Sequence, residues 1–211
     1  MNQGLATTEY VVRTIAETAI ANEDYFCQLD SVVGDGDFGY SLARGFERLL
    51  DQWDELDRSD VATFLQKVAM VVTSRVGGTS GPIWGTGFLR ASMVARKADA
   101  ITGETVVAML RAAAEGIMAR GGASLGEKTL LDALVPMTDT LETKLAGGPP
   151  LGEVLDATAA SARDAAEATR ELQARRGRAS YTGERSIGSV DAGATAVGVL
   201  ATAIANSWPG R

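Results

Sequence analysis

Apolar residues recur at helical spacing along almost the whole chain. Near the amino terminus, Val11, Ile15 and Ile20 follow one another with polar residues between them, which is typical of one buried helix face. No run of alternating apolar and polar residues bounded by hairpin turns competes with this pattern. The pattern predicts an all-α fold of about eight helices, at about 7–29, 38–54, 59–72, 82–98, 102–121, 128–145, 151–175 and 192–207.

Capping residues support several of these boundaries. Asp60, Thr102 and Asp191 precede apolar-periodic segments and are typical N-cap residues, whereas Gly121-Gly122 is a typical helix stop. The connections are short, which favours antiparallel neighbours. We therefore expect an up-and-down closed bundle or barrel that forms a single domain over residues 1–211.

Glycine-rich loops follow every second predicted helix. The chain has 24 glycines among 211 residues, against a usual share of about 7%. Their main clusters lie at 34–39, 77–81, 121–126 and 183–193. In an up-and-down bundle, the loops after the first, third, fifth and seventh helices meet at one end. This end is therefore the expected ligand site, because glycine lets the backbone approach a ligand closely.

Composition excludes several classes of function. The chain has no histidine, so Ser-His-Asp and Cys-His nucleophile systems and histidine-ligated metal sites are excluded. The net charge of −7 argues against nucleic-acid binding. No apolar run is long enough to span a membrane, and 1–10 does not resemble a secretion signal. With Cys27 as its single cysteine, the protein is expected in the reducing cytoplasm.

Three aspartates lie close together around the first glycine-rich loop. Asp30, Asp35 and Asp37 fall within eight positions, and no basic residue lies among them. Their mutual repulsion favours a bound cation, and an all-oxygen ligand set suits Mg²⁺ or Ca²⁺. The alternative is that Asp35 and Asp37 serve only as turn and N-cap residues. Their spacing leaves both interpretations open.

The next two glycine-rich loops differ in what they indicate. Gly77-Gly78-Thr79-Ser80-Gly81-Pro82 leads into a helix and could bind an anion through N–H and hydroxyl groups, although a flexible capped turn explains it equally well. The loop from Gly121 to Thr129 superficially resembles a P-loop. It fails that test because Glu127 separates Gly126 from Lys128, and because a helix, not a strand, precedes it.

The fourth loop region is rich in arginine. Four arginines lie within residues 175–185, and their guanidinium groups suit phosphate oxygens. A solvated helix end with cations near its carboxyl terminus is the alternative. Taken together, the four loops favour a nucleotide di- or triphosphate with Mg²⁺ bridging carboxylates and phosphates. Because histidine is absent, activation of an acceptor alcohol is expected from another subunit.

Several motifs resemble those of a known family, in order along nearly the whole chain. They are Gly34-Asp35-Gly36-Asp37-x-Gly39, Gly77-Gly78-Thr79-Ser80-Gly81-Pro82, Gly126-Glu127-Lys128-Thr129-x-x-Asp132-Ala133-Leu134 and Gly177-Arg178-Ala179-Ser180-Tyr181-x-Gly183-Glu184-Arg185-Ser186. The sequence is similar to the nucleotide-binding L subunit of bacterial dihydroxyacetone kinase. The resemblance implies an eight-helix barrel with ADP or ATP at one end and two Mg²⁺ ions on Asp30, Asp35 and Asp37. It also implies nucleotide contacts from Phe38, Gly39, Ser41, Thr79, Ser80, Gly121, Leu130, Arg178, Asp191 and Gly193.

The same resemblance implies that the protein works with partners. A separate K-type subunit would hold a short ketose on its own histidine, and Arg178 would stabilise charge on the transferred phosphate. ATP serves as donor in some members, whereas others keep ADP that an M-type phosphotransferase-system protein re-phosphorylates. The oligomeric state is open, a homodimer included.

The sequence departs from the family pattern at two positions. Phe38 replaces a common histidine, and Ala192 replaces a common proline. These changes leave open a paralogous kinase subunit for another ketose such as a tetrulose. A nucleotide-sensing regulator that docks on a transcription factor is a further alternative, as is a purely structural helical scaffold.

Overall fold

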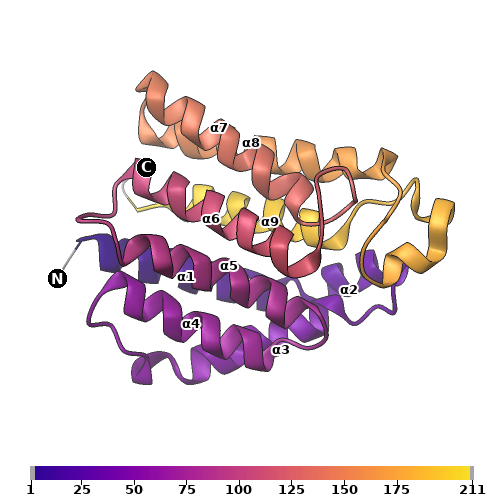
Figure 1. Cartoon of the computed structure of the whole chain (residues 1–211), viewed down its shortest axis with the longest axis horizontal. Helices are drawn as coiled ribbons and strands as arrows, with labels where there is room; N and C mark the ends of the chain where they lie inside the picture. The colour runs from indigo at the N-terminus through magenta and orange to yellow at the C-terminus, as the bar shows by residue number, and fades with distance from the viewer. Residues whose placement is uncertain (1–2, 210–211) are drawn as a thin grey trace.

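The computed structural model describes residues 3–209, so the outermost residues of the expected 1–211 domain lie outside it. The described residues form α-helices joined by loops and short 3₁₀ helices, without strands, which confirms the all-α prediction (Figure 1). The α-helices are α1 (Gln3–Ala21), α2 (Glu23–Ser31), α3 (Phe38–Asp51), α4 (Val61–Arg75), α5 (Ser80–Ala95), α6 (Gly103–Gly121), α7 (Leu131–Gly147), α8 (Leu151–Ala168) and α9 (Ala192–Ser207). The 3₁₀ helices are η1 (Trp53–Glu55), η2 (Thr169–Glu171) and η3 (Arg178–Ser186).

Two predicted helices differ substantially from the observed ones, whereas the bounds of the others agree to within three residues. The segment predicted as one helix over 7–29 is broken at Asn22, where the backbone leaves helical geometry at φ −108° and ψ 19°. The Asn22 side chain donates a hydrogen bond to the Thr18 carbonyl, a local bond that competes with helix continuation. The helix predicted over 151–175 ends at Ala168 and continues only as η2.

The helices pack into a closed ring. Each of α3 to α8 packs against the next helix along the chain, α9 returns to α1, and α1 packs against α3. The helix α2 lies outside this order and packs on α3. The ring of eight helices confirms the predicted closed bundle, and α2 is the additional element that the sequence pattern did not separate from α1.

Capping residues act as predicted at three helix starts. The Asp60 carboxylate accepts from the Thr63 N–H at 2.8 Å. Thr102 and Asp191 make the corresponding bonds at the starts of α6 and α9. At the other end of α6, Gly122 adopts the left-handed conformation with φ 58°. Local sequence chemistry therefore fixes these boundaries directly.

Apolar side chains from all parts of the ring fill its interior. The largest fully buried side chains include Phe46 and Phe64 of the ring, and Phe26 of α2, which joins the same cluster. A second cluster centred on Leu131 joins α6, α7, α8 and α9. Burying each large apolar side chain contributes about 1.5–3 kcal/mol, so this interior is the main source of stability. Within 3–209, no helix combines the length and apolar character needed to cross a bilayer.

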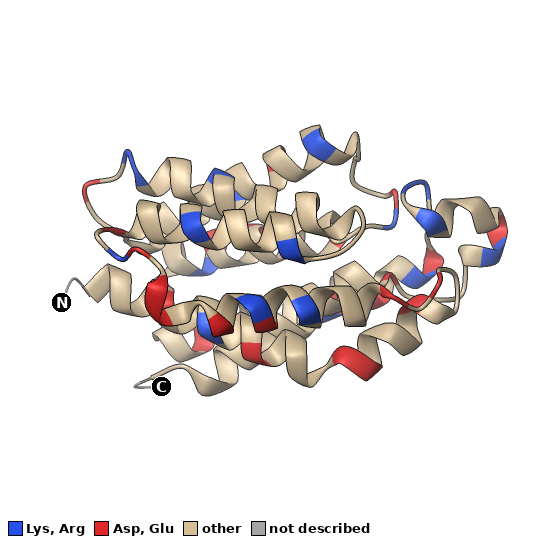
Figure 2. Ribbon diagram, turned by 90° about the horizontal axis from the view of Figure 1, so that it is seen from below, with Lys and Arg blue, Asp and Glu red and all other residues tan. Residues whose placement is uncertain are grey.

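The glycine-rich loops lie at one end of the ring, on the right in Figure 1. Arg178 in η3 forms an ion pair with Asp35, so the fourth loop region meets the first. The N–H of Arg175 donates to the Glu127 carbonyl at 3.0 Å, which joins the fourth region to the third. Both basic and acidic residues gather at this end (Figure 2). The prediction that the glycine-rich loops meet at one end of the bundle is therefore confirmed.

Candidate functional site

The turn between α2 and α3 brings the first loop back on itself. The Gly34 N–H donates to the Asp30 carbonyl at 2.6 Å, and a Cβ atom on Gly34 would overlap the Asp30 carboxylate. Gly36 has φ +75°, a conformation that side-chain-bearing residues seldom adopt. These glycines let the turn close tightly, so that the aspartates beside them approach one another.

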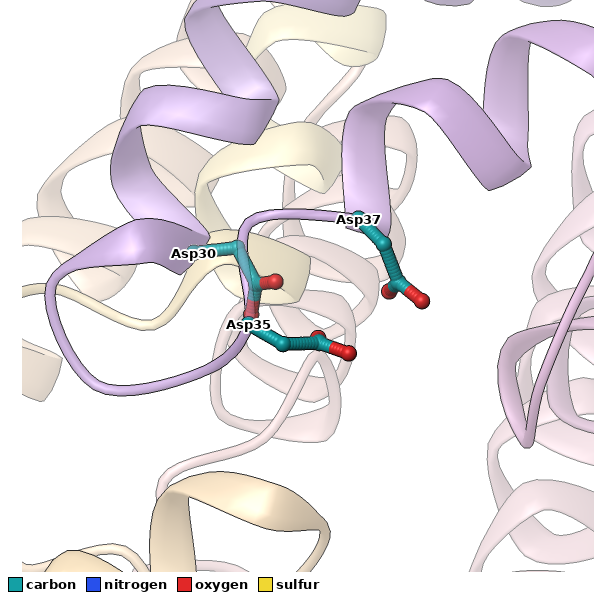
Figure 3. Close-up of side chains that lie close together, drawn as sticks. All are labelled: Asp30, Asp35 and Asp37. Atoms are coloured by element: carbon teal, nitrogen blue, oxygen red, sulfur yellow. The ribbon is translucent and has the colours of Figure 1, made fainter.

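Asp30, Asp35 and Asp37 form a cluster of carboxylates. One ligand oxygen from each residue lies within 4.8 Å of the others, and the side chains extend into the same space (Figure 3). Asp37 is the N-cap of α3, yet its side chain makes no capping hydrogen bond, so a purely capping role does not account for it. Three carboxylates in one place offer the all-oxygen ligand type that Mg²⁺ prefers.

Arg178 supplies positive charge beside these carboxylates. It begins η3, forms an ion pair with Asp35, and its Nη1 lies 3.8 Å from the Asp37 carboxylate. The arginine-rich segment is not the end of a long helix, because α8 ends at Ala168; that alternative interpretation is wrong. Guanidinium and carboxylate groups thus share a site that suits a metal together with phosphate.

The second loop borders the aspartate cluster through α3. A Cβ atom on Gly77 would lie 2.7 Å from the Ser41 Oγ, so this loop touches the first turns of α3. Thr79 precedes α5 and makes no capping hydrogen bond, and Ser80 is the first residue of that helix. The amino end of α5, with its hydroxyl groups, therefore follows a loop that contacts the helix capped by Asp37, and a helix amino end is a suitable anion site.

Gly121 and Gly193 lie at two further places where the loops approach closely. A Cβ atom on Gly121 would lie 3.3 Å from Ile83 in the first turn of α5. A Cβ atom on Gly193 would lie 3.3 Å from Leu130 and 3.1 Å from the Asp191 carboxylate. The loop before α7 and the amino end of α9 therefore touch.

Asp191 has an unusual electrostatic environment. Its carboxylate accepts from the Ala194 N–H at 2.7 Å and caps α9. Desolvation raises the pKa of Asp191 to about 7, and the nearby Asp132 adds to this effect, whereas the backbone hydrogen bond opposes it. This group therefore changes charge near neutral pH.

Two predicted nucleotide contacts face the protein interior. The Phe38 ring packs against Phe26 with centroids 6.0 Å apart. Gly39 is buried against α2, where a Cβ atom would overlap the Glu23 carbonyl. Gly39 has only backbone atoms to offer a ligand, and the half-buried Phe38 ring replaces the imidazole that the family pattern has at this position.

Sequence analysis missed three residues that organise this end. Asp132 accepts from the N–H groups of Gly126 at 2.5 Å and Thr129 at 2.7 Å, which shapes the third loop. Glu127 pairs with Arg176, and Lys128 is buried. All three residues belong to one of the family motifs, and a P-loop is excluded there, but nothing in the residue pattern indicates that the lysine is buried.

A family comparison adds to this geometry. Residues 32–206 match the model of the DAK2 domain. The chain belongs to the DAK2 domain family. The matched range contains all the site residues discussed above except Asp30, which lies just before it.

Relatives of this DAK2 protein include subunits and longer enzymes. It is 38% identical over 174 residues to the PEP-dependent dihydroxyacetone kinase, ADP-binding subunit DhaL of Escherichia coli, covering 82% of this chain and 83% of that one. It is 38% identical to the ADP-binding subunit DhaL of a PTS-dependent dihydroxyacetone kinase of Lactococcus lactis, with coverage of 82% and 81%. The L-erythrulose 1-kinase of Mycolicibacterium smegmatis is 34% identical, over 92% of this chain and 34% of that enzyme.

Solved structures agree with the fold. The native dihydroxyacetone kinase of C. freundii superposes with a TM-score of 0.76 at 25% identity, over 96% of this chain. The structure of that kinase in complex with AMP-PNP and Mg²⁺ gives the same TM-score at 24% identity. The chain spans only about a third of the length of the C. freundii kinase, 34% in both comparisons.

Proposed function

We propose that this protein is the phosphoryl-transfer subunit of a short-ketose kinase of the dihydroxyacetone kinase type. It holds Mg·ADP or Mg·ATP at the loop end of the bundle and transfers phosphate to a ketose bound on a K-type partner subunit. The main support is the convergence of Asp30, Asp35 and Asp37 with Arg178 at the end that carries the glycine-rich loops. The ADP-binding subunits among its relatives support the nucleotide.

The residues of this end have distinct roles in the proposal. Asp30, Asp35 and Asp37 hold Mg²⁺, two ions in the fullest form of the proposal, and the metal would neutralise phosphate charge. Thr79 and Ser80, at the amino end of α5, bind phosphate oxygens through hydroxyl and N–H groups. Arg178 adds a guanidinium to the transferred phosphoryl group.

Three further segments complete the nucleotide site in this proposal. Gly121 and Leu130 line the cleft near the base, and Asp191 with Gly193 closes it from the start of α9. Ser41 and the backbone of Phe38 and Gly39 contribute from the first turn of α3. These assignments rest on the family motifs, and the contacts between the loops support them.

The acceptor belongs to the partner in this proposal. Transfer breaks the bond between the terminal phosphorus and its bridging oxygen and forms a new bond to a ketose hydroxyl oxygen. In the proposal the hydroxyl proton passes to a base on the partner, since this chain has no histidine, the side chain that serves most often as a general base. With ADP as the resident nucleotide, an M-type phosphotransferase-system protein would restore the phosphate. We place the protein in the cytoplasm with these partners.

A tetrulose is the second candidate acceptor. Relatives named L-erythrulose 1-kinase and D-erythrulose kinase are 34% and 32% identical to this chain. They are only slightly more distant than the 38% identical dihydroxyacetone kinase subunits. Because the ketose would sit on the partner subunit, the choice of acceptor depends on that subunit.

The test is transfer of labelled phosphate. The protein is incubated with Mg²⁺, labelled ATP and a K-type subunit, with dihydroxyacetone or erythrulose as acceptor. Formation of labelled ketose phosphate only when both proteins are present supports the proposal. Binding of nucleotide without transfer to either ketose, with ATP or with ADP charged by an M-type protein, would instead favour a nucleotide-sensing regulator.

A further inference from the structure

Lys128 is a buried lysine whose ammonium group lies among backbone carbonyls. Only 3% of the residue is exposed. Its Nζ lies within hydrogen-bond distance of four carbonyl oxygens, at 3.0 Å from Thr169, 3.0 Å from Leu172, 2.6 Å from Ser186 and 2.6 Å from Ser189. These four carbonyls, called here the carbonyl cage, come from η2, the residue that follows it, the end of η3 and the connection between η3 and α9.

The cage requires a protonated amine. An ammonium group has three N–H donors, whereas a neutral amine has two and would direct a lone pair at a carbonyl oxygen. Desolvation lowers the pKa of Lys128, and the nearby Asp191 opposes that shift. Four oxygens at 2.6–3.0 Å stabilise the charge that burial disfavours.

The backbone at Lys128 is strained. Its φ is +61°, and it is the only non-glycine residue with positive φ in the described part of the chain. Such a conformation costs on the order of 1 kcal/mol or more and persists only where surrounding contacts hold it. This backbone turn sends the side chain beneath the segment 169–189 and away from solvent.

The preceding residue, Glu127, holds the same segment at a second place. Glu127 accepts two hydrogen bonds from the Arg176 guanidinium, at 2.7 and 3.0 Å, and these lower the pKa of Glu127. Its carbonyl accepts from the Arg175 N–H at 3.0 Å. Glu127 and Lys128, which are consecutive in the third loop, thus both hold the segment in which η3 begins at Arg178.

The held segment has little apolar burial of its own. Beyond η2, in residues 172–190, only Ala174 and Ser186 are buried, and all the others are exposed or half-buried. The regular structure of these residues is limited to η3, which is itself interrupted at Gly183. A segment with so few apolar contacts opens readily unless polar contacts hold it.

We propose that Lys128 is a positioning residue whose ammonium group, seated in the carbonyl cage, holds the segment 169–189 so that Arg178 faces Asp35 and Asp37. The inference deepens the proposed function, on which it rests for the role of Arg178. It assigns to this lysine no contact with nucleotide or metal. Its effect on transfer passes through the order of the segment.

The first test measures order in the segment without nucleotide. Hydrogen exchange is followed by mass spectrometry in the wild type, in Lys128→Met, and in Lys97→Met, a control at an exposed lysine beyond the end of α5. Lys128→Met is expected to speed exchange over 172–190 about 10- to 100-fold, as loss of one or two charge-assisted hydrogen bonds would. Exchange in α3 to α6 and in the control should stay unchanged. Unchanged exchange over 172–190 would overturn the proposal.

The second test is chemical rescue. Lys128→Ala leaves the carbonyls in place, and propylammonium at millimolar concentration is expected to restore protection of 172–190 and phosphate transfer. The neutral analogue propanol should restore neither. Rescue by propanol as well, or no rescue by either, would overturn the proposal, as would global unfolding of both Lys128 variants with the amine present.

These readouts separate this inference from the proposed function. If the wild type binds no Mg·ADP, the proposed function fails, but hydrogen exchange still shows whether Lys128 orders the segment. If the wild type transfers phosphate, Lys128→Met should lower the rate with ketose saturated while leaving the ketose KM unchanged, because the acceptor is held elsewhere. A changed KM with an unchanged rate would contradict a positioning role toward Arg178.

Discussion

At the scale of single residues, the aspartate cluster gives the sharpest expectation. Three carboxylates whose oxygens lie within 4.8 Å repel one another when ionised, and a divalent cation relieves that repulsion. Replacement of one ligand by an amide keeps the shape but removes a negative charge. The cluster therefore predicts a loss of metal-dependent binding without a loss of fold.

Asp35→Asn and Asp37→Asn should each weaken Mg·ADP binding well over tenfold, since changes outside the ligand shell alone cost about 10- to 100-fold. Calorimetric titration with circular dichroism of each variant checks this. The control is Asp99→Asn, an exposed carboxylate in the connection between α5 and α6, where affinity should stay at the wild-type value. Equal affinity in all four proteins would remove the metal role from the cluster.

Asp191 predicts a pH dependence of stability. Its pKa of about 7 in the folded protein exceeds the unfolded value of about 3.9, so the folded state binds the proton more tightly. The contribution to stability is therefore full below about pH 4 and is lost as pH rises through 7. Asp191→Asn keeps an oxygen acceptor for the α9 cap but cannot ionise.

Between pH 5 and 8, the free energy of unfolding of the wild type should fall by about 1–3 kcal/mol relative to that of Asp191→Asn. This range allows for the partial exposure of the residue. Urea denaturation at several pH values measures this difference. If the free energies of unfolding of the two proteins change with pH in parallel, the pKa of Asp191 is not raised in the folded protein.

At the scale of helices, the sequence predicts most elements because their signals are local. Apolar spacing and capping residues such as Asp60 and Thr102 act within one turn, and the structure confirms them. The break at Asn22 was missed because the apolar pattern continues through it. The structure of 172–190 was missed because its order comes from Lys128, more than 40 residues away in sequence.

Two glycines provide a matched test of helix packing. Gly39 in α3 lies against α2, where a Cβ atom would overlap the Glu23 carbonyl and lie 2.7 Å from the Cys27 nitrogen. Gly87 in α5 has only ordinary contacts, at 3.4 Å or more. Gly39→Ala should destabilise the protein by about 1–3 kcal/mol or more, because backbone atoms must move apart.

Gly87→Ala should stabilise the protein by up to about 1 kcal/mol through helix propensity. Denaturant unfolding of both variants measures the free energies. The same substitution is thus expected to change the free energy of unfolding in opposite directions at two helical positions. A Gly39→Ala variant as stable as the wild type would mean that α2 does not pack closely against α3 at Gly39.

At the scale of the whole molecule, chain order explains where the site lies. A ring of antiparallel helices gathers alternate loops at one end, and this parity was predictable from the sequence without knowledge of any contact. Which side chains meet there was less predictable. The aspartates are close in sequence, so their grouping was expected, whereas the pairing of Arg178 with them depends on the ring closing.

The most direct measurement is calorimetric titration of the wild-type protein with ADP, once in excess Mg²⁺ and once in EDTA. The account predicts one nucleotide per chain in the presence of Mg²⁺ and at least about a hundredfold weaker binding in its absence, because the carboxylates then repel the phosphates. Equal affinity in the two conditions, or no binding in either, would contradict the claim that this end of the bundle binds a magnesium nucleotide.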